Sequence, residues 1–330
     1  MKIGVVGCGA VGSYYGAKLA RASHEVHFLL RSDYDVVRRK GVQILSPQGD
    51  FHVQPKCAAS PAAIGACDLV IIALKSTAND RLPDLVPLLA GPSTAVLTLQ
   101  NGLGNEECLA RFLPVSQIMG GLCFVGLYRV EPGIIRHLAR GTIILGEFQR
   151  WPEPRTHVIA EMFRNAGVPC KVTDDLARTH WEKLVWNVPF NGLGLASAAG
   201  FDAVVRGETS ADTPLGPCLD TGQLLGDQRW EALAHELMLE VIATARALGF
   251  QIQDSMAADQ IEKTRPMAAY RASTQIDFER GQPLELDGMF FEPLRRAKSA
   301  GVATPRLEAL CRVIRQLEAR RKELSDRLPA

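Results

Sequence analysis

A glycine-rich turn close to the first residue is the clearest arrangement that could do chemistry. The motif GxGxxG occupies residues 7–12, directly after the apolar run 2–6 and before a helical segment at 13–21. Its first glycine permits a sharp turn, its second lets the backbone approach a pyrophosphate, and its third lets helix and strand pack closely. The helix then offers unpaired N–H groups to the anion. We therefore expect a dinucleotide on Gly7, Cys8, Gly9, Ala10, Val11 and Gly12, the alternative being a glycine-rich turn without a ligand.

A positive charge follows the second apolar run. Residues 25–30 lead directly into Arg31. A carboxylate at this point accepts hydrogen bonds from the ribose 2′-hydroxyl of NAD, whereas an arginine pairs with the 2′-phosphate of NADP. Arg31 can hold that phosphate bidentately, and Ser32 adds a hydroxyl donor. The pattern favours NADP(H), although Asp33 would suit NAD and Arg31 could instead be an ordinary solvated residue.

Two further polar residues follow apolar runs of the same kind. Lys75 comes after the run 68–74, and Asn101 comes after the run 94–99. Ligands of open α/β sheets lie at the carboxyl ends of the strands, so Lys75 can neutralise a cofactor phosphate while Asn101 faces the nicotinamide and the substrate. On position alone, each could also be a solvated loop residue.

A polar stripe runs along an otherwise apolar helical segment at 181–191. Lys183, Asn187 and Asn191 recur at a spacing of four, which places them on one face of a helix. An ammonium group and two amides among Leu, Val, Trp and Phe neighbours are costly unless they face a ligand or a wet cleft. A purely structural polar face is the alternative.

More polar groups gather around the break at residues 281–283. They include Ser273 on one side, and Glu285 and Asp287 on the other. Acidic first turns of a helix are the structural explanation for the two carboxylates. The seven histidines form no HExxH pair, and no GxSxG elbow occurs, so we expect neither a metal site nor a serine nucleophile.

The elements that must position these residues fall into two halves. The runs 2–6, 25–30, 68–74 and 94–99 are short and apolar, as buried strands of a parallel sheet are. Between residues 118 and 148, we expect hairpin-connected strands with turns at 131–133 and at Arg140-Gly141. The predicted fold is α/β, with an N-terminal Rossmann-type dinucleotide-binding domain at 1–175 and a C-terminal all-helical domain at 176–330.

The second half shows helical spacing almost throughout. Its clearest helix is 230–248, where apolar residues recur every three or four positions before Gly249. Further helices are expected at 175–195, 256–280, 286–300 and 305–320. The segment 209–227 holds three glycines and two prolines without periodicity, which predicts an exposed loop or insertion.

Composition narrows the class of partner. The chain has 330 residues, of which 47% are hydrophobic and 22% charged, with a formal net charge of +1, so bulk charge favours neither nucleic acid nor an anionic membrane. No apolar stretch reaches the roughly 18–20 residues that span a bilayer. The eight cysteines form no CxxC pair. We expect a cytoplasmic protein with a small-molecule partner, and a homodimer is a candidate assembly.

These motifs together resemble the ketopantoate reductases (2-dehydropantoate 2-reductases), which reduce ketopantoate to pantoate with NADPH in pantothenate biosynthesis. The resemblance covers nearly the whole chain and is carried by GCGAVG at 7–12, Arg31, ALKS at 73–76, QNGLGN at 100–105, WEKLVWNVPFN at 181–191 and STQIDFERGQPLELD at 273–287.

Residue by residue, the resemblance implies the roles of the candidate site. Arg31 and Lys75 would hold the 2′-phosphate, and Lys183 would be the general acid that protonates the reduced carbonyl. The substrate of this family is a small 2-keto acid, and Glu285 would bind its hydroxyl end or assist the lysine. The implied substrate contacts are Asn101, Asn187, Asn191 and Ser273.

Two positions depart from the family pattern. An asparagine that many members carry ten residues after the one matching Asn191 is replaced by Phe201, and the Asn-Gly that usually follows the acidic motif is replaced around Phe290. A related NADP-dependent dehydrogenase of another small 2-keto or hydroxy acid is therefore an alternative. A non-catalytic NADP(H) sensor is another, but cofactor binding alone would require neither Lys183 nor Glu285.

Overall fold

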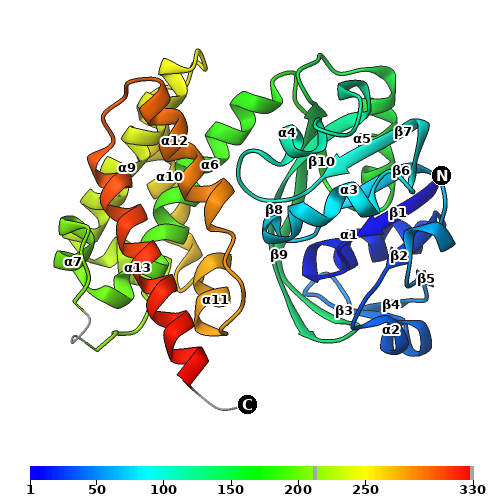
Figure 1. The fold of residues 1–330 in the computed structure, drawn as a ribbon, viewed down its shortest axis with the longest axis horizontal. Helices are drawn as coiled ribbons and strands as arrows, with labels where there is room; N and C mark the ends of the chain where they lie inside the picture. Colours follow the sequence, from blue (N-terminus) through cyan, green and yellow to red (C-terminus); the bar gives the residue numbers. More distant parts are fainter. Residues whose placement is uncertain (211–213, 328–330) are drawn as a thin grey trace. The chain divides into compact units, whose positions relative to one another are not determined.

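The computed structural model describes residues 1–210 and 214–327, with side chains up to residue 323, and it divides into two compact units (Figure 1). The first unit is Met1–Thr179 and the second is His180–Ala330. The predicted boundary after residue 175 lies directly before the helix that crosses this division.

The first unit is built on one ten-stranded sheet. Its spatial order is β4-β3-β9-β8-β7-β6-β1-β2-β5, with β10 paired to β9 outside this path. The strands are β1 (Lys2–Val6), β2 (Glu25–Leu29), β3 (Val42–Leu45), β4 (Phe51–Val53), β5 (Lys56–Ala58), β6 (Cys67–Ile72), β7 (Ala90–Thr98), β8 (Ile118–Glu131), β9 (Ile134–Glu147) and β10 (Cys170–Val172).

The four predicted buried strands are confirmed as β1, β2, β6 and β7. They pair in parallel with one another, and β1 lies between β2 and β6. The chain therefore leaves β1 toward one side of the sheet and later returns to its other side. Ligands of open α/β sheets bind at such a switch point, beyond the carboxyl end of the strand. In this sheet that position belongs to the glycine-rich turn.

Helices cover both faces of the sheet. They are α1 (Ala10–Arg21), α2 (Tyr34–Lys40), α3 (Leu82–Leu85), α4 (Asn105–Leu109) and α5 (Pro154–Asn165), with short 3-10 turns at Pro61–Ala63, Ser76–Arg81 and Val115–Gln117. Alternate residues of a strand point to opposite faces. Accordingly, Val5 packs in one apolar cluster with Tyr14 of α1, and Val6 packs in a second with Leu82 of α3.

The segment 118–148 forms one hairpin rather than two. Strands β8 and β9 pair antiparallel around the predicted turn at Pro132-Gly133. The predicted turn at Arg140-Gly141 is wrong, because both residues lie inside β9, where the register skips from Arg140 to Thr142. Gly141 has a φ of +132° and its carbonyl accepts a hydrogen bond from the Tyr15 hydroxyl. Gly141 therefore marks a β-bulge that packs against α1.

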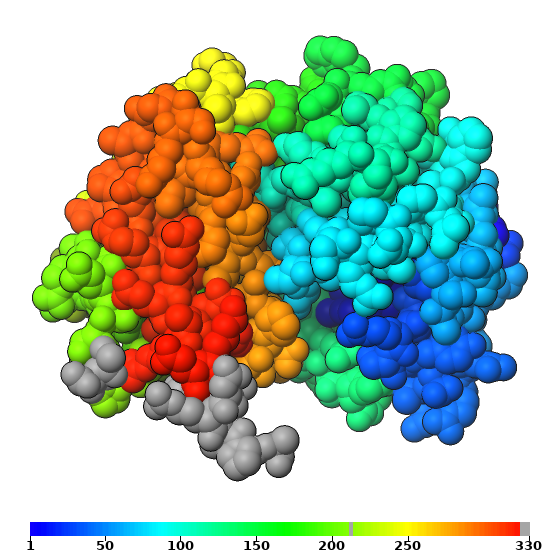
Figure 2. Space-filling model, in the orientation of Figure 1, coloured from blue at the N-terminus to red at the C-terminus, as the bar shows by residue number. Residues whose placement is uncertain are grey.

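The second unit is helical in its described residues, as predicted. The helices α12 and α13 lie at its surface, in orange and red in Figure 2. Its helices are α6 (Leu176–Ala196, which begins in the first unit), α7 (Phe201–Arg206), α8 (Thr221–Gly226), α9 (Gln228–Ala247), α10 (Ser255–Thr264), α11 (Ser273–Glu279), α12 (Glu292–Ser299) and α13 (Pro305–Arg327), with 3-10 turns at Ser197–Ala199 and Arg265–Met267 and a π turn at Asp287–Phe291.

The single helix predicted at 256–280 is wrong, because the chain breaks between α10 and α11. Pro266 cannot donate an intrahelical hydrogen bond, and Ala268 has a φ of +49°. The carbonyls of Ala268 and Tyr270 instead accept hydrogen bonds from the side chain and backbone of Thr221. Two segments far apart in the sequence are thus joined where the helix was expected to continue.

The prediction of a loop at 209–227 is wrong for its last part, and residues 211–213 within it lie outside the described structure. Asp220 caps α8 by accepting a hydrogen bond from the backbone N–H of Gln223 at 2.9 Å. Leu224 and Leu225 are buried. A helix of six residues is too short to show the periodicity that identifies longer helices.

Candidate functional site

The glycine-rich turn joins β1 to α1, and two of its glycines are required by the protein itself. Gly7 has a φ of +98°, and a Cβ at this position would lie 2.2 Å from the backbone nitrogen of Leu74. A Cβ on Gly12 would lie 2.2 Å from the Gly7 carbonyl oxygen. The first glycine therefore makes the turn, and the third lets α1 start against it.

Gly9 is different, because no packing constraint explains it. It has φ −75° and ψ −152°, which other residues adopt, and a Cβ there would meet no atom of the described structure within 4 Å. Gly9 is the N-cap of α1, and neither a side-chain cap nor an acidic residue occupies the first turn. An open, uncapped helix N-terminus suits the pyrophosphate of a dinucleotide. The residues present thus fit the predicted cofactor.

Cys8 stands between these glycines with its thiol directed into the protein. Its Sγ lies 3.6 Å from the Leu29 carbonyl oxygen of β2. Burial, and then the nearby Cys57 and Asp33, raise the pKa of the Cys8 thiol well above its ordinary value. The thiol therefore stays protonated at neutral pH and is a poor nucleophile.

The end of β2 presents a cation and a masked carboxylate. Arg31 is exposed, and its side chain forms no hydrogen bond or ion pair with the described residues. Asp33 is only 7% exposed. Its Oδ1 accepts a hydrogen bond from the Ser32 hydroxyl at 2.9 Å, and its Oδ2 accepts one from Nη1 of Arg129 at 2.5 Å.

Lys75 and Asn101 lie in the loops that follow β6 and β7, each three residues after the end of its strand. A chain of amide hydrogen bonds joins these loops, and sequence reasoning missed it. Gln100 Nε2 donates to Asn79 Oδ1 at 2.7 Å, and Asn79 Nδ2 donates to Asn105 Oδ1 at 3.0 Å. Asn105 Nδ2 then donates to the Asn101 carbonyl oxygen at 3.1 Å. We call Gln100, Asn79 and Asn105 the amide relay; it fixes the backbone beside Asn101. The only sequence signal was the excess of amide residues after two strands.

In the second unit, α6 carries the predicted polar stripe. The helix is continuous over Leu176–Ala196, so Lys183, Asn187 and Asn191 share one face. Apolar neighbours such as Val185 and Val188 are fully buried on the other faces. The amide of Asn187 is 7% exposed, yet it makes no hydrogen bond within the described part of the chain. Such a group is suited to a polar ligand.

Asn191 and Ser273 lie together although 82 residues separate them. The Ser273 hydroxyl donates to Asn191 Oδ1 at 3.3 Å, and the backbone N–H of Thr274 donates to the same oxygen at 3.1 Å. Asn191 thereby holds the first turn of α11, which is a structural role. With the oxygen occupied, only the amide nitrogen remains to donate to a ligand.

Glu285 is half-buried in the segment between α11 and the π turn. The two positions that depart from the family pattern are occupied by packing residues. Phe201 stacks edge-on against Trp230 with ring centroids 5.0 Å apart. Phe290 is fully buried, and a Cβ on Gly192 would lie 3.0 Å from its ring. Phe201 therefore packs against α9, and Phe290 packs against α6.

Two searches of the described residues gave no site. No group of three His, Cys, Asp or Glu side chains in ranges 1–210 and 214–327 could hold a metal ion. No described helix is both long and apolar enough to cross a membrane.

Comparisons with known proteins agree along the chain. The family model for ketopantoate reductase PanE/ApbA matches residues 3–150, and the model for the C-terminal part of the same family matches residues 218–318. The 2-dehydropantoate 2-reductase of a Nostoc species is 37% identical over 97% of this chain and 96% of its own length. That of Halobacterium salinarum is 28% identical over 96% of this chain and 98% of its own.

Solved structures give the same result. The crystal structure of 2-dehydropantoate 2-reductase from Geobacter metallireducens has a TM-score of 0.87 and 41% identity, covering 96% of this chain and 99% of that one. A D-mandelate dehydrogenase solved with NADH has a TM-score of 0.83 over 98% of this chain and all of its own, at 19% identity, and so shares the fold.

Proposed function

Because this chain belongs to the ketopantoate reductase family, we propose that it reduces ketopantoate to pantoate with NADPH as the hydride donor. The chain is an oxidoreductase. The observation that carries the proposal is the presence in one chain of an open glycine-rich turn, in the first unit, and of the Lys183, Asn187 and Asn191 stripe, in the second.

The preference for NADPH rests on Arg31. An exposed guanidinium without an ion partner in the described structure can take a 2′-phosphate bidentately, and Lys75, which follows β6 on the other side of β1, adds a second cation. A carboxylate suited to NAD is present as Asp33, but the contacts with Ser32 and Arg129 occupy both of its oxygens. When bound, the dinucleotide supplies a hydride to the carbonyl carbon.

The remaining chemistry belongs to side chains of this protein. Lys183 donates a proton to the substrate carbonyl oxygen, so that no alkoxide accumulates. Asn191 offers an amide N–H, because its oxygen is held by Ser273 and Thr274. Together with Asn187 and Ser273 of the same unit, it binds the keto acid, and Glu285 accepts a hydrogen bond from the terminal hydroxyl of ketopantoate.

The test is NADPH oxidation by the purified full chain with a panel of 2-keto acids. Ketopantoate should be the best substrate, and Lys183→Ala should lower kcat by on the order of 10² while the Kd for NADPH stays near that of the parent protein. Preference for another keto acid would favour the alternative of a related NADP-dependent dehydrogenase. NADPH binding without turnover of any keto acid would favour the sensor.

We also propose that the protein is cytoplasmic and that it forms a homodimer. A cytoplasmic location agrees with the search for membrane-spanning helices, which found none among the described residues. Size-exclusion chromatography with light scattering would distinguish the proposed homodimer from a monomer.

A further inference from the structure

We propose that Arg129 determines the choice between NADPH and NADH from outside the phosphate-binding turn, by holding the Asp33 carboxylate and so leaving Arg31 available to the 2′-phosphate. The inference rests on the proposed function, because it concerns which dinucleotide the same site accepts. It assigns a role to two residues that the family motifs do not include.

The first observation is the set of contacts around Asp33. The side chain of this residue is 10% exposed, and the guanidinium of Arg129, which is 46% exposed, donates to it. The Ser32 hydroxyl donates to its other oxygen. A carboxylate with both oxygens engaged and its charge matched by a guanidinium is a weak acceptor for a further ligand.

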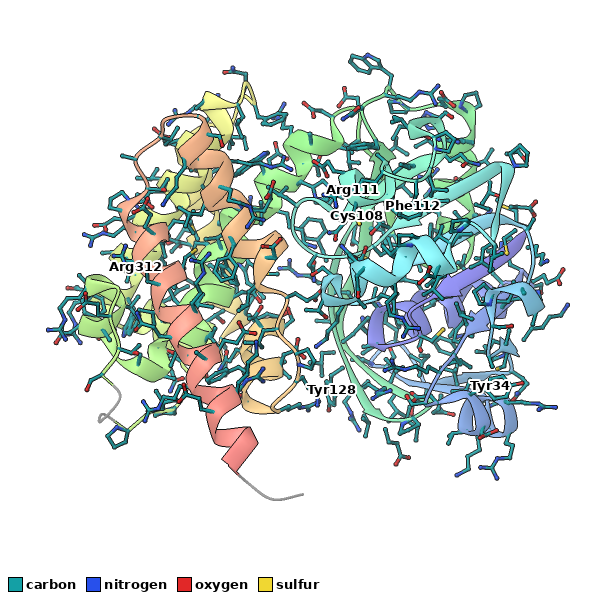
Figure 3. The ribbon with its side chains drawn as sticks, viewed as in Figure 1. Tyr34, Cys108, Arg111, Phe112, Tyr128 and Arg312 are labelled. Carbon is teal, nitrogen blue, oxygen red and sulfur yellow. The ribbon has the colours of Figure 1, made fainter. Side chains whose placement is uncertain are left out.

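The second observation explains how a residue 96 positions away reaches the end of β2. Arg129 lies near the end of β8, opposite Ile135 of β9, and β9 also pairs with β3. Strand β3 follows α2 directly, so the end of the β8–β9 hairpin is anchored beside the segment that contains Asp33. The backbone N–H of Gln43 fixes it by donating to the Gly133 carbonyl. Figure 3 labels Tyr128, the residue before Arg129 on β8, and Tyr34, the residue after Asp33 at the start of α2.

The third observation is what the pairing does for Arg31. Arg31 is only two residues from Asp33, yet Asp33 pairs with Arg129, and Arg31 makes no ion pair within the described structure. Without Arg129, the Asp33 charge would either attract Arg31 or face the phosphate. Either change weakens phosphate binding, because opposite charges compete for the guanidinium and like charges repel. The same freed carboxylate could accept a hydrogen bond from the 2′-hydroxyl of NADH.

The test measures Kd for NADPH and NADH by fluorescence titration of the full chain. The variants are Arg129→Ala, Asp33→Asn and the double variant, with Arg136→Ala as a matched control. Arg136 is exposed on β9 and forms no ion pair in the described structure. We expect Arg129→Ala to reduce the NADPH over NADH preference by roughly tenfold, the size of one charge-assisted contact. Asp33→Asn should cost little, and the double variant should regain most of the preference.

The double variant separates this inference from a direct contact. If Arg129 touched the phosphate itself, Asp33→Asn would not restore the loss, and that result would overturn the proposal. An unchanged preference in Arg129→Ala would also overturn it. Circular dichroism melts check folding, and Arg129→Gln replaces the alanine variant if that fails to fold.

The same titrations give a different result if the NADPH assignment itself is wrong. Equal affinities of the wild-type protein for NADPH and NADH would refute the NADPH assignment. The role of Arg129 would then be judged by NADH alone: tighter NADH binding in Arg129→Ala that disappears in the double variant supports it, and unchanged NADH binding rejects it.

Discussion

A single added methyl group should affect different properties of the protein at two glycines of the same turn. We predict that Gly9→Ala weakens dinucleotide binding without harming the fold, and that Gly12→Ala harms the fold. The reason is geometric: a Cβ at Gly9 meets no described atom within 4 Å, whereas a Cβ at Gly12 lies 2.2 Å from the Gly7 carbonyl oxygen. The two variants are chemically identical controls for one another.

The magnitudes follow from these contacts. At Gly12 the obstructing atom is backbone, so the turn must move by on the order of 1 Å to restore a normal contact distance. Overpacking of this kind costs about 1–3 kcal/mol, and the better helix propensity of alanine returns only about 0.5–1 kcal/mol. We expect a net loss of about 1 kcal/mol in the free energy of unfolding, or roughly 2–4 °C in melting temperature for a unit of this size.

At Gly9 the effects on stability nearly cancel. Alanine is a poorer N-cap than glycine, but it restricts the unfolded chain, and each effect is below about 1 kcal/mol. The melting temperature should therefore change by less than that of Gly12→Ala. A methyl group at the open end of α1 would keep a pyrophosphate from the backbone, and we expect the Kd for NADPH to rise at least tenfold, which corresponds to about 1.4 kcal/mol.

The assays are thermal melts without cofactor and fluorescence titration with NADPH on both variants. Unchanged NADPH affinity in a folded Gly9→Ala protein would show that no pyrophosphate lies against this glycine. A loss of stability in Gly9→Ala as large as that in Gly12→Ala would refute the argument from packing.

Three further predictions concern other parts of the chain. Glu285→Ala should reduce the discrimination against keto acids that lack a terminal hydroxyl, from roughly one to two orders of magnitude in kcat/KM to near unity, as measured with paired substrates. Asn79→Leu should break the amide relay and lower kcat/KM by about tenfold, whereas Asn79→Asp, which keeps the acceptor for Gln100, should lose less. Lys18→Met should raise the melting temperature at pH 7, because burial lowers the pKa of this ammonium. The cost exists while lysine is charged in both states and disappears as pH rises toward the unfolded value near 10.5, so melts at alkaline pH should show a smaller gain.

The elements that sequence reasoning identified correctly are those with a strong local signal. Strand β1 was predicted over its full length, and α6 and α9 to within one or two residues, because each combines a long apolar pattern with a clear end. The wrong predictions occurred where one sequence feature is compatible with two local structures. Gly141 could mark either a turn or a bulge, and only the packing of α1 against β9 distinguishes them. Pro266 is a local signal for the break after α10, but the hydrogen bonds that hold the break come from Thr221, which is distant in the sequence.

The candidate site shows the same division between local and distant determinants. Gly7, Gly12 and the α6 stripe follow from spacing alone, because a turn and a helix face are local features. The amide relay and the contact of Asn191 with Ser273 join separate loops, so no local pattern announces them.

Asp33 shows why the distant part matters for function. Read locally, Arg31 and Asp33 favour different cofactors, and the sequence ranks NADP(H) first only because Arg31 directly follows the apolar run. The structure gives them different surroundings, because the β8–β9 hairpin brings Arg129 to the carboxylate and leaves Arg31 without an ion partner among the described residues. Whether a charged residue can bind a cofactor thus depends on whether another side chain already neutralises its charge. That in turn depends on how the sheet brings its strands together. Cofactor preference in this chain should therefore change with substitutions on a hairpin that belongs to no binding motif.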